Sequence, residues 1–395
     1  MKPKFSKLMI LATVIIMDIL GGAEVDLFVP SFPELQGYFG LSPFLVEGLL
    51  SINFTGFCLS LFFVGALADH YGRKPIILLG LIIFTIGSIF CSWASSYALL
   101  MIGRFLQGIG VAAPATLCFL IIADSYSMKD QRFFIGILNS IVNVAVAVSP
   151  IIGSYIAIYF HWQGNFIALL LLGLLALLMT IFFIPSTKLP EHKETLQLSG
   201  YLPIFKAKPL ILAIICLVFM FSHWWIFIGI SPILYMEGLG VPLSEFGYYQ
   251  GSLALVFALG SIISSFIINR FDQKLLLKIS YVICILSLIT ITLATYSNTP
   301  NPLLITLSLI PFYIGTVIPY TIIYPICLNY MPQAKGKIAS LIQIIRLVVT
   351  ALGLEISGYY YNGSFQNIGL LLIFLTLSSI VTIFLVVKND NFIKL

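Results

Sequence analysis

The sequence predicts an all-α membrane protein in which twelve transmembrane helices form two bundles of six. Composition is the first indication: 60% of the 395 residues are hydrophobic and 9% are charged, with a mean hydropathy of +1.07. A soluble core of this size does not need so much apolar sequence. The second is that apolar windows of about 18 to 25 residues, enough to cross ~30 Å of hydrocarbon, recur from end to end. The third is positive charge gathered in alternate loops.

Twelve apolar windows give the predicted helices in order along the chain, each ending where polar or turn-forming residues interrupt it. The predicted spans are 8–28, 43–66, 75–94, 98–123, 133–158, 164–184, 209–235, 246–269, 275–296, 302–329, 338–361 and 366–387. Because the number is even, both termini are predicted to lie on the same side of the membrane.

The positive charges predict which side that is. Of the 20 Lys and Arg residues, 18 lie at the termini or around the loops that follow even-numbered helices, and Arg104 and Arg346 lie inside helices. The positive-inside rule therefore places both termini in the cytoplasm. The first helix has no small-residue cleavage site, so it is expected to be retained.

A compact charged stretch follows the second predicted helix, where residues 65–75 read GALADHYGRKP. Arg73 and Lys74 belong in the cytoplasm by the positive-inside rule, so the stretch is interpreted as a short loop on that side. Gly65 and Gly72 would let two helix ends approach closely and turn sharply. Asp69 can then meet a cation or a helix N-terminus.

This stretch closely resembles the G-x-L-A-D-x-x-G-R-K signature of the loop between the second and third helices of Major Facilitator Superfamily transporters. The resemblance implies the major facilitator fold, with two six-helix pseudo-repeats around a central site. We expect the stretch to latch the cytoplasmic ends of the two halves in the outward-facing state. The predicted latch residues are Gly65, Asp69, Gly72, Arg73 and Lys74.

The longest hydrophilic connection, residues 185–208, divides the chain into two sets of six helices. We expect an N-terminal half at 1–184, a cytoplasmic linker at 185–208 and a C-terminal half at 209–395. A weakened counterpart of the charged stretch, residues 269–274, follows the eighth helix at the corresponding position. Two related halves are therefore predicted, as in transporters built from repeats.

Two further elements resemble the superfamily pattern. Residues 104–113 resemble R-x-x-Q-G-x-G-x-A-A, and residues 149–154 resemble the antiporter element G-P-x-x-G-G with Ser149 and Ser154 in place of glycines. Small residues in these elements allow tight helix packing. The predicted packing residues are Gln107, Gly108, Gly110, Pro150 and Gly153.

Two shorter stretches resemble one subfamily, the Bcr/CflA drug-resistance transporters of the drug/proton antiporter group. Residues 26–33 are similar to D-x-Y-L-P-A-L-P, and residues 231–235 are similar to S-P-x-x-Y. The resemblance implies proton-driven efflux of small amphipathic molecules across the bacterial inner membrane by alternating access. The alternative is an exporter or importer of an anionic metabolite such as a carboxylate siderophore.

Ionisable residues inside the membrane are costly and therefore mark function or a partner. Asp18 lies about ten residues into the first helix, at ~15 Å depth, and Asp26 is turned by only about 80° from it. The resemblance supports both acids as proton carriers, with Arg104 as their counter-ion. Permanent pairing of Asp26 with Arg104 is the structural alternative, and Glu24 is expected to be structural.

Arg346, near the middle of the eleventh helix, indicates an anionic group somewhere in the substrate. Its structural alternative is a salt bridge to an acid of the first helix or to Glu355. Aromatic residues crowd the seventh helix, where flat molecules would stack. The predicted substrate-binding residues are Asp18, Arg346, Gln343, Trp224 and Tyr235.

Several function classes are not supported by the sequence. It contains no Walker loop, Rossmann glycine fingerprint, G-x-S-x-G or H-E-x-x-H motif, so we expect no enzyme activity and no cofactor. His223 lacks partners at metal-ligand spacing, and the six cysteines are interpreted as buried small hydrophobes. The basic residues form no patch for nucleic acid. The expected partners are a small-molecule substrate, protons and the lipid bilayer, for a monomer.

Overall fold

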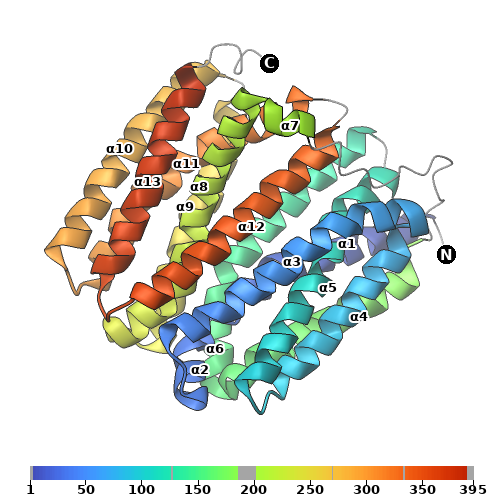
Figure 1. Ribbon diagram of the computed structural model, residues 1–395. Helices are drawn as coiled ribbons and strands as arrows, with labels where there is room; N and C mark the ends of the chain where they lie inside the picture. The colour runs from blue at the N-terminus through green and yellow to red at the C-terminus, as the bar shows by residue number, and fades with distance from the viewer. Residues whose placement is uncertain (1–2, 126–127, 186–201, 269, 332–333, 389–395) are drawn as a thin grey trace. The chain divides into compact units, whose positions relative to one another are not determined.

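The computed structural model describes residues 3–125, 128–185, 202–268, 270–331 and 334–388, and these residues form helices and short connections (Figure 1). The elements are α1 (Pro3–Asp26), η1 (Val29–Ser31), α2 (Phe32–Phe39), α3 (Pro43–Tyr71), α4 (Arg73–Ser92), α5 (Tyr97–Ser125), α6 (Met128–Phe183), α7 (Leu202–Lys206), α8 (Lys208–Pro232), η3 (Ile233–Gly238), α9 (Leu243–Ile267), α10 (Gln273–Ser297), α11 (Pro302–Tyr330), α12 (Lys335–Tyr360) and α13 (Phe365–Lys388).

Within these described residues, 11 helical spans are long and apolar enough to cross a membrane. One of them, 144–183, has 40 residues and belongs to α6, which is interrupted at His161 by a non-helical φ of 59° and ψ of −175°. The two parts of α6 correspond to the predicted helices 133–158 and 164–184. Counted as two, they give the predicted twelve helices, so the fold class is confirmed.

The charged stretch differs from its prediction as a short loop. Helix α3 continues to Tyr71 and α4 starts at Arg73, so Gly72 alone separates them. Its φ of 91° lies in the region that glycine adopts without strain. The expected close approach at Gly65 is wrong in this structure, because a Cβ there would meet nothing within 4 Å. Helix-forming residues such as Ala66 and Leu67 explain the longer helix.

A short helix, α2, occupies part of the connection that the sequence left without structure. Its Phe32 and Leu35 are fully buried, and Phe39 packs against Trp162 with ring centroids 5.7 Å apart. Phe28 contacts both Phe32 and Phe166. An aromatic cluster therefore anchors this connection to the break in α6.

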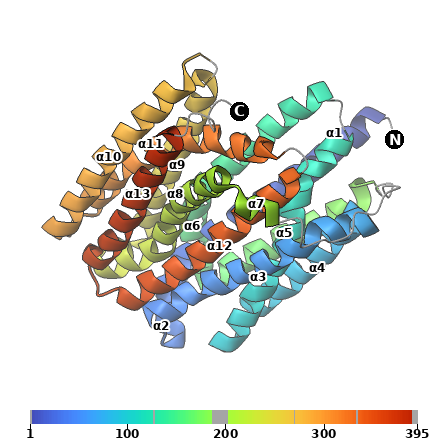
Figure 2. The same ribbon diagram turned by 45° about the horizontal axis from the view of Figure 1, so that its top comes forward.

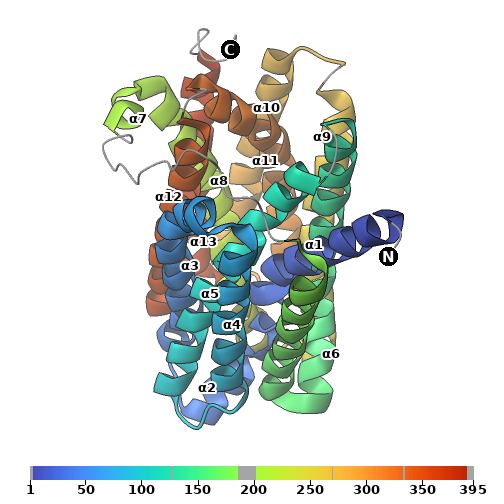
Figure 3. The same ribbon diagram turned by 90° about the vertical axis from the view of Figure 1, so that its right-hand side faces the viewer.

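The first of two compact units contains residues 1–41 and 48–196. In it α4 packs beside α5 and α6, and α1 packs against α5 and α6 (Figure 3). Glycines allow these contacts: a Cβ on Gly108 would collide with the Asn53 carbonyl of α3, and one on Gly110 with the Phe84 backbone of α4. A Cβ on Gly153 would meet the Leu27 carbonyl. The helices thus approach backbone to backbone at these positions.

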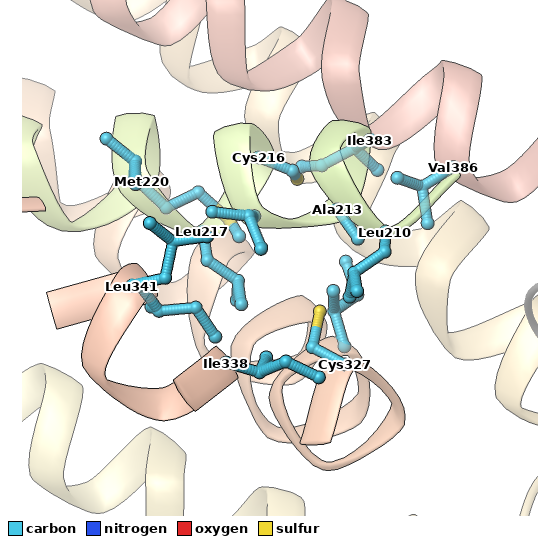
Figure 4. Packing of buried hydrophobic residues seen from close by; sticks show 14 of the residues in the cluster. Leu210, Ala213, Cys216, Leu217, Met220, Cys327, Ile338, Leu341, Ile383 and Val386 are labelled. Atoms are coloured by element: carbon cyan, nitrogen blue, oxygen red, sulfur yellow. The ribbon is translucent and has the colours of Figure 1, made fainter. Parts of the chain in front are cut away.

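The second unit contains residues 42–47 and 197–395. Helix α8 packs against α12 and α13, and α10 packs against α11 and α13 (Figure 2). Apolar side chains of α8, α11, α12 and α13 form its core, among them Leu210, Leu217, Cys327, Ile338 and Ile383 (Figure 4). All six cysteines of the chain are buried and free, as predicted.

The two units repeat one packing pattern. The α4–α5 and α4–α6 contacts of the first unit have counterparts in the α10–α11 and α10–α13 contacts of the second. Most of the predicted linker, residues 186–201, lies outside the described residues. The end of that stretch, Leu202–Lys206, forms α7.

We expect Gly108→Ala to destabilise the protein by about 1–3 kcal/mol, the usual range for overpacking a tight contact. The added methyl group would be forced into the α3 backbone. Gly65→Ala is the matched control, because this glycine is helical and has open space around its Cβ position. It should be neutral or stabilising by up to about 1 kcal/mol, since alanine favours helix. Thermal unfolding in detergent measures both; equal stability of the two variants would contradict the assignment of a tight contact.

Candidate functional site

Asp18 is an isolated acid in the middle of α1. Its residue surface is 6% exposed. The Cys118 thiol of α5 donates to Asp18 Oδ1 with an S···O distance of 3.9 Å, and Asp18 Oδ2 has no hydrogen-bond partner in the described part of the chain. No described cation pairs with this carboxyl group. A carboxyl group so placed is most easily accommodated with a proton bound, because an unpaired buried charge is costly.

The packing of α1 on α5 positions this carboxyl group. A Cβ on Gly21, almost one turn after Asp18, would lie 2.8 Å from Ala115 Cβ, so only glycine permits the observed approach. Ala115 in turn precedes Cys118 by one turn of α5. The glycine thus brings the two helices together and sets Asp18 against Cys118.

A second acid of α1, Glu24, forms a buried ion pair with Arg104 of α5. Arg104 Nη1 lies 3.1 Å from Glu24 Oε1, and both side chains are almost fully buried. Arg104 Nη1 also donates to Gln107 Oε1 at 2.7 Å, and Asn53 Nδ2 donates to Glu24 Oε1 at 2.6 Å. Charge-assisted hydrogen bonds of this kind are about twice as strong as neutral ones.

Further contacts extend this polar network to α3 and α4. Arg104 Nε donates to the Leu49 carbonyl at 3.4 Å, and its guanidinium lies 4.1 Å from the centre of the Phe28 ring. Gln107 Nε2 donates to Ser88 Oγ at 2.9 Å. This network links α1, α3, α4 and α5 around the buried Glu24–Arg104 pair.

The partner of Arg104 therefore differs from the one considered in the sequence. Asp26 was the acid expected within its reach, but the structure pairs Arg104 with Glu24. Asp26 ends α1 and is 1% exposed. This ion pair agrees with the structural role expected for Glu24. Glu24 therefore differs from Asp18, whose carboxyl group has no cationic partner among the described residues.

The charged turn between α3 and α4 holds two other helix ends in the same unit. The Arg73 guanidinium donates to the Leu120 carbonyl of α5. Lys74 Nζ donates to the Ile181 carbonyl of α6 at 2.8 Å. Ile181 is among the last four residues of α6, whose carbonyls lack intrahelical partners. Leu120 lies in the penultimate turn of α5, so both cations lie near the negative end of a helix dipole. The side chain of Asp69 lies outside the described residues.

In the second unit, Arg346 of α12 lies beside aromatic rings and not beside an acid. Its guanidinium is 4.6 Å from the centre of the Phe221 ring of α8, and the Phe221 ring lies 4.7 Å from the Tyr320 ring of α11. Among the described residues, neither Glu355 nor any other carboxylate pairs with it. Gln343, three residues earlier, is half-buried.

The remaining predicted substrate residues have different surroundings. Trp224 is half-buried and packs edge-on to Tyr313, with ring centroids 4.6 Å apart. The Tyr235 hydroxyl is 2.6 Å from Thr306 Oγ1, and its ring is 1% exposed and contacts Phe227. Tyr235 is thus buried in this conformation, and no contact between the described residues joins Trp224 to Arg346. Substrate binding by Trp224 and Tyr235 stays a prediction.

Sequence reasoning missed several residues of these sites. Asn53 donates to Glu24, Cys118 donates to Asp18, and Ser88 accepts from Gln107, which itself accepts from Arg104. Their signal was a polar or thiol side chain within an apolar run, which is common and therefore weak. Tyr320 and Tyr324 lie one turn apart on α11 and stack with centroids 5.5 Å apart. That spacing was visible, but nothing in the sequence linked it to Arg346.

A family model for the Major Facilitator Superfamily matches residues 14–354. The chain belongs to this superfamily. Among curated relatives, this superfamily member is 29% identical over 365 residues to the bicyclomycin resistance protein homolog of Haemophilus influenzae, with 89% of each chain covered. It is 25% identical over 367 residues to the multidrug resistance protein MdtL of Shewanella oneidensis, with 91% of this chain and 90% of the relative covered. The similarity to the Bcr/CflA group is thereby confirmed.

Solved structures show the same fold. A crystal structure of a D-xylose-proton symporter has a TM-score of 0.75 at 12% identity, covering 96% of this chain and 97% of the other. An inward-facing, unoccupied bacterial homolog of the human lysosomal transporter Spinster has a TM-score of 0.68 at 19% identity, covering 100% and 97%. This superfamily member is thus a multi-pass membrane protein of a transporter family.

Proposed function

We propose that the protein is a drug/proton antiporter that exports small amphipathic molecules by alternating access. The observation that carries the proposal is Asp18, a buried carboxyl group without a cationic partner among the described residues. An acid in this state can bind a proton from one side of the membrane and release it when a substrate or the other aqueous side stabilises its charge. The two relatives described above are named for bicyclomycin resistance and for multidrug resistance.

The proposed cycle assigns different tasks to the charged residues. Asp18 takes up a proton from outside, and Asp26, eight residues further along α1, relays protons at the outer end of the same helix. Arg104 acts through Glu24: their ion pair fixes α1 against α5 and thereby controls how accessible Asp18 is. Proton binding precedes substrate release, so the proton gradient drives export.

The environment of the protein is part of the same proposal. The protein is proposed to lie in the bacterial inner membrane as a monomer. Both termini are placed in the cytoplasm, because 18 of the 20 lysines and arginines lie at the termini or around the loops on the same side of the predicted helices. It has no enzymatic step of its own. The alternative function, a carrier for an anionic metabolite such as a carboxylate siderophore, is supported by Arg346 alone, whereas the names of the relatives support drug efflux.

Transport by the purified protein in liposomes under an imposed pH gradient tests this function. Cationic, neutral and anionic compounds of similar size are offered in parallel, with liposomes lacking a gradient as the control. We expect accumulation of several amphipathic compounds that depends on the gradient. Movement of one carboxylate metabolite only would favour the alternative, and uptake equal in the presence and absence of the gradient would exclude proton coupling.

Asp69→Asn tests the proposed latch at the turn between α3 and α4. Arg73 and Lys74 already hold α5 and α6 there. Asp69 is not expected to contact the substrate, because the turn lies at the membrane surface, ~15 Å from the bilayer midplane. We expect slower transport with unchanged substrate affinity, and His70→Gln, at the exposed neighbour, should change neither. A large loss of affinity at normal turnover would contradict a latch role.

A further inference from the structure

We infer that the second unit contains a subsite for the anionic end of flat aromatic molecules, formed by Arg346 with Phe221, Tyr320 and Tyr324. The proposed transport function explains why such molecules would reach the subsite, but binding to it does not require transport. The inference names a substrate class that drug efflux alone does not specify: aromatic compounds with a carboxylate or an equivalent acidic group.

Three helices supply the subsite. Arg346 comes from α12, Phe221 from α8 and both tyrosines from α11. The guanidinium faces the Phe221 ring at 4.6 Å, and this ring is 4.7 Å from the Tyr320 ring. Tyr320 and Tyr324 stack with an interplanar angle of 22°. The cation thus lies over the first of three aromatic rings that contact one another in sequence, and a flat molecule can stack on such rings.

The subsite lies near the middle of the membrane-spanning segments. The starts of α8 and α12 and the end of α11 share one end of the unit, since Leu210, Ile338 and Cys327 pack in one core (Figure 4). Counting from those ends at ~1.5 Å per residue, Tyr320, Arg346 and Phe221 lie at depths of about 15, 16 and 20 Å. Substrate sites of transporters built from repeats lie at this depth.

The contact between α8 and α12 holds Arg346 over Phe221. Thr350 Oγ1, one turn after Arg346, donates to Ser222 Oγ at 3.1 Å. One turn further, Gly353 lies so close to Ile226 that any Cβ would collide with that side chain. Because the helices are joined by a hydrogen bond and by a close approach, the cation and the ring are held in a fixed arrangement before a ligand binds.

The two arginines inside the membrane segments show what the subsite lacks. Arg104 has a carboxylate, a glutamine oxygen and a backbone carbonyl as acceptors. Arg346 is half-buried, its Nε has no acceptor, and within the described residues no acid pairs with it. An arginine at this depth is costly without an anion. A planar carboxylate would meet its guanidinium through two parallel hydrogen bonds.

Three probes that share the naphthalene ring and differ in charge test the subsite: 2-naphthoate, 2-naphthamide and 2-naphthylmethylammonium. Equilibrium dialysis against the purified protein in detergent measures their affinities. We expect the wild type to bind naphthoate about tenfold or more tightly than naphthamide, as a charge-assisted bidentate pair predicts. Naphthylmethylammonium should bind most weakly, because it carries the same charge as Arg346.

Variants assign the effect to individual groups. Arg346→Gln should remove the preference for naphthoate while changing naphthamide binding by less than about twofold. Arg346→Lys should retain part of the preference, because the charge remains and the planar fork is lost. Phe221→Leu should weaken naphthoate and naphthamide alike. Lys278→Gln, at an exposed cation of α10, is the charge-matched control and should leave all three affinities unchanged.

Naphthoate binding that is the same in the wild type and in well-folded Arg346→Gln would overturn the inference, as would a wild type without preference for naphthoate. The outcome is separable from that of the proposed function. If neutral and cationic compounds move under a pH gradient while naphthoate binding does not depend on Arg346, only the subsite is wrong. If the preference exists and no compound moves, only the transport function is wrong.

Discussion

Asp18→Asn is expected to reduce gradient-driven transport to the level of protein-free liposomes while the protein still folds and binds substrate. Asparagine has nearly the size of aspartate but carries no exchangeable charge. The carboxyl group is packed against Cys118 and makes no ion pair in the described part of the chain, so its replacement leaves no opposite charge unpaired. Asp18→Asn should therefore lose transport under a pH gradient and retain the thermal unfolding midpoint of the wild type.

Asp272→Asn is the matched control for this experiment. The Asp272 side chain is exposed and caps α10 by accepting from the Leu275 N–H at 3.0 Å, and asparagine serves equally well as an N-cap. Stability and transport should both be retained in the control. Normal dependence of transport on the gradient in Asp18→Asn would assign the proton to another group.

Glu24→Gln is expected to have the largest effect on stability. Removing one partner of a buried ion pair leaves the other charge uncompensated, which costs about 3–5 kcal/mol. Arg104 would keep only neutral acceptors, and Asn53 would lose its charge-assisted hydrogen bond. The free energy of unfolding in detergent and urea measures the change. Glu245→Gln, at an exposed residue in the first turn of α9, should be neutral.

A double variant distinguishes the cost of an uncompensated buried charge from the cost of changed side-chain packing. Replacing both members of a buried pair by apolar residues of similar volume is often neutral or stabilising. Glu24→Leu combined with Arg104→Met should therefore recover much of the stability that either change loses alone. Full additivity of the two single changes would show that the pair is not coupled. If the double variant folds but no longer couples transport to protons, the Glu24–Arg104 pair takes part in the cycle as proposed.

The fold followed from the sequence because membrane helices are specified by length and hydropathy alone. Even the break in α6 at His161 falls between the predicted spans 133–158 and 164–184. The conformation of the charged stretch, residues 65–75, was harder to predict. Its residues favour helix up to Tyr71, and Gly72 alone, with a φ of 91°, makes the turn. A family motif identifies such a stretch without giving its conformation.

The sites were predictable only in part. Helical periodicity predicts that Asp18 and Glu24 lie on different faces of α1. It does not predict which helix packs against each face. That depends on contacts such as Gly108 against Asn53, which sets how α3 meets α5 and so brings Asn53 to Glu24. Likewise Arg346 was visible as a charge inside a helix, whereas the Phe221 ring beneath it and the Tyr320 ring beyond are brought there by three-dimensional packing.

Proton release on substrate binding tests the central claim most directly. The purified protein is placed in weakly buffered detergent solution with a pH-sensitive dye, and a transported compound is added at saturating concentration. If the proton on Asp18 is exchanged against substrate, the wild type acidifies the solution by a fixed number of protons per protein, and Asp18→Asn binds the compound without acidification. Equal proton release by the wild type and Asp18→Asn would contradict the account.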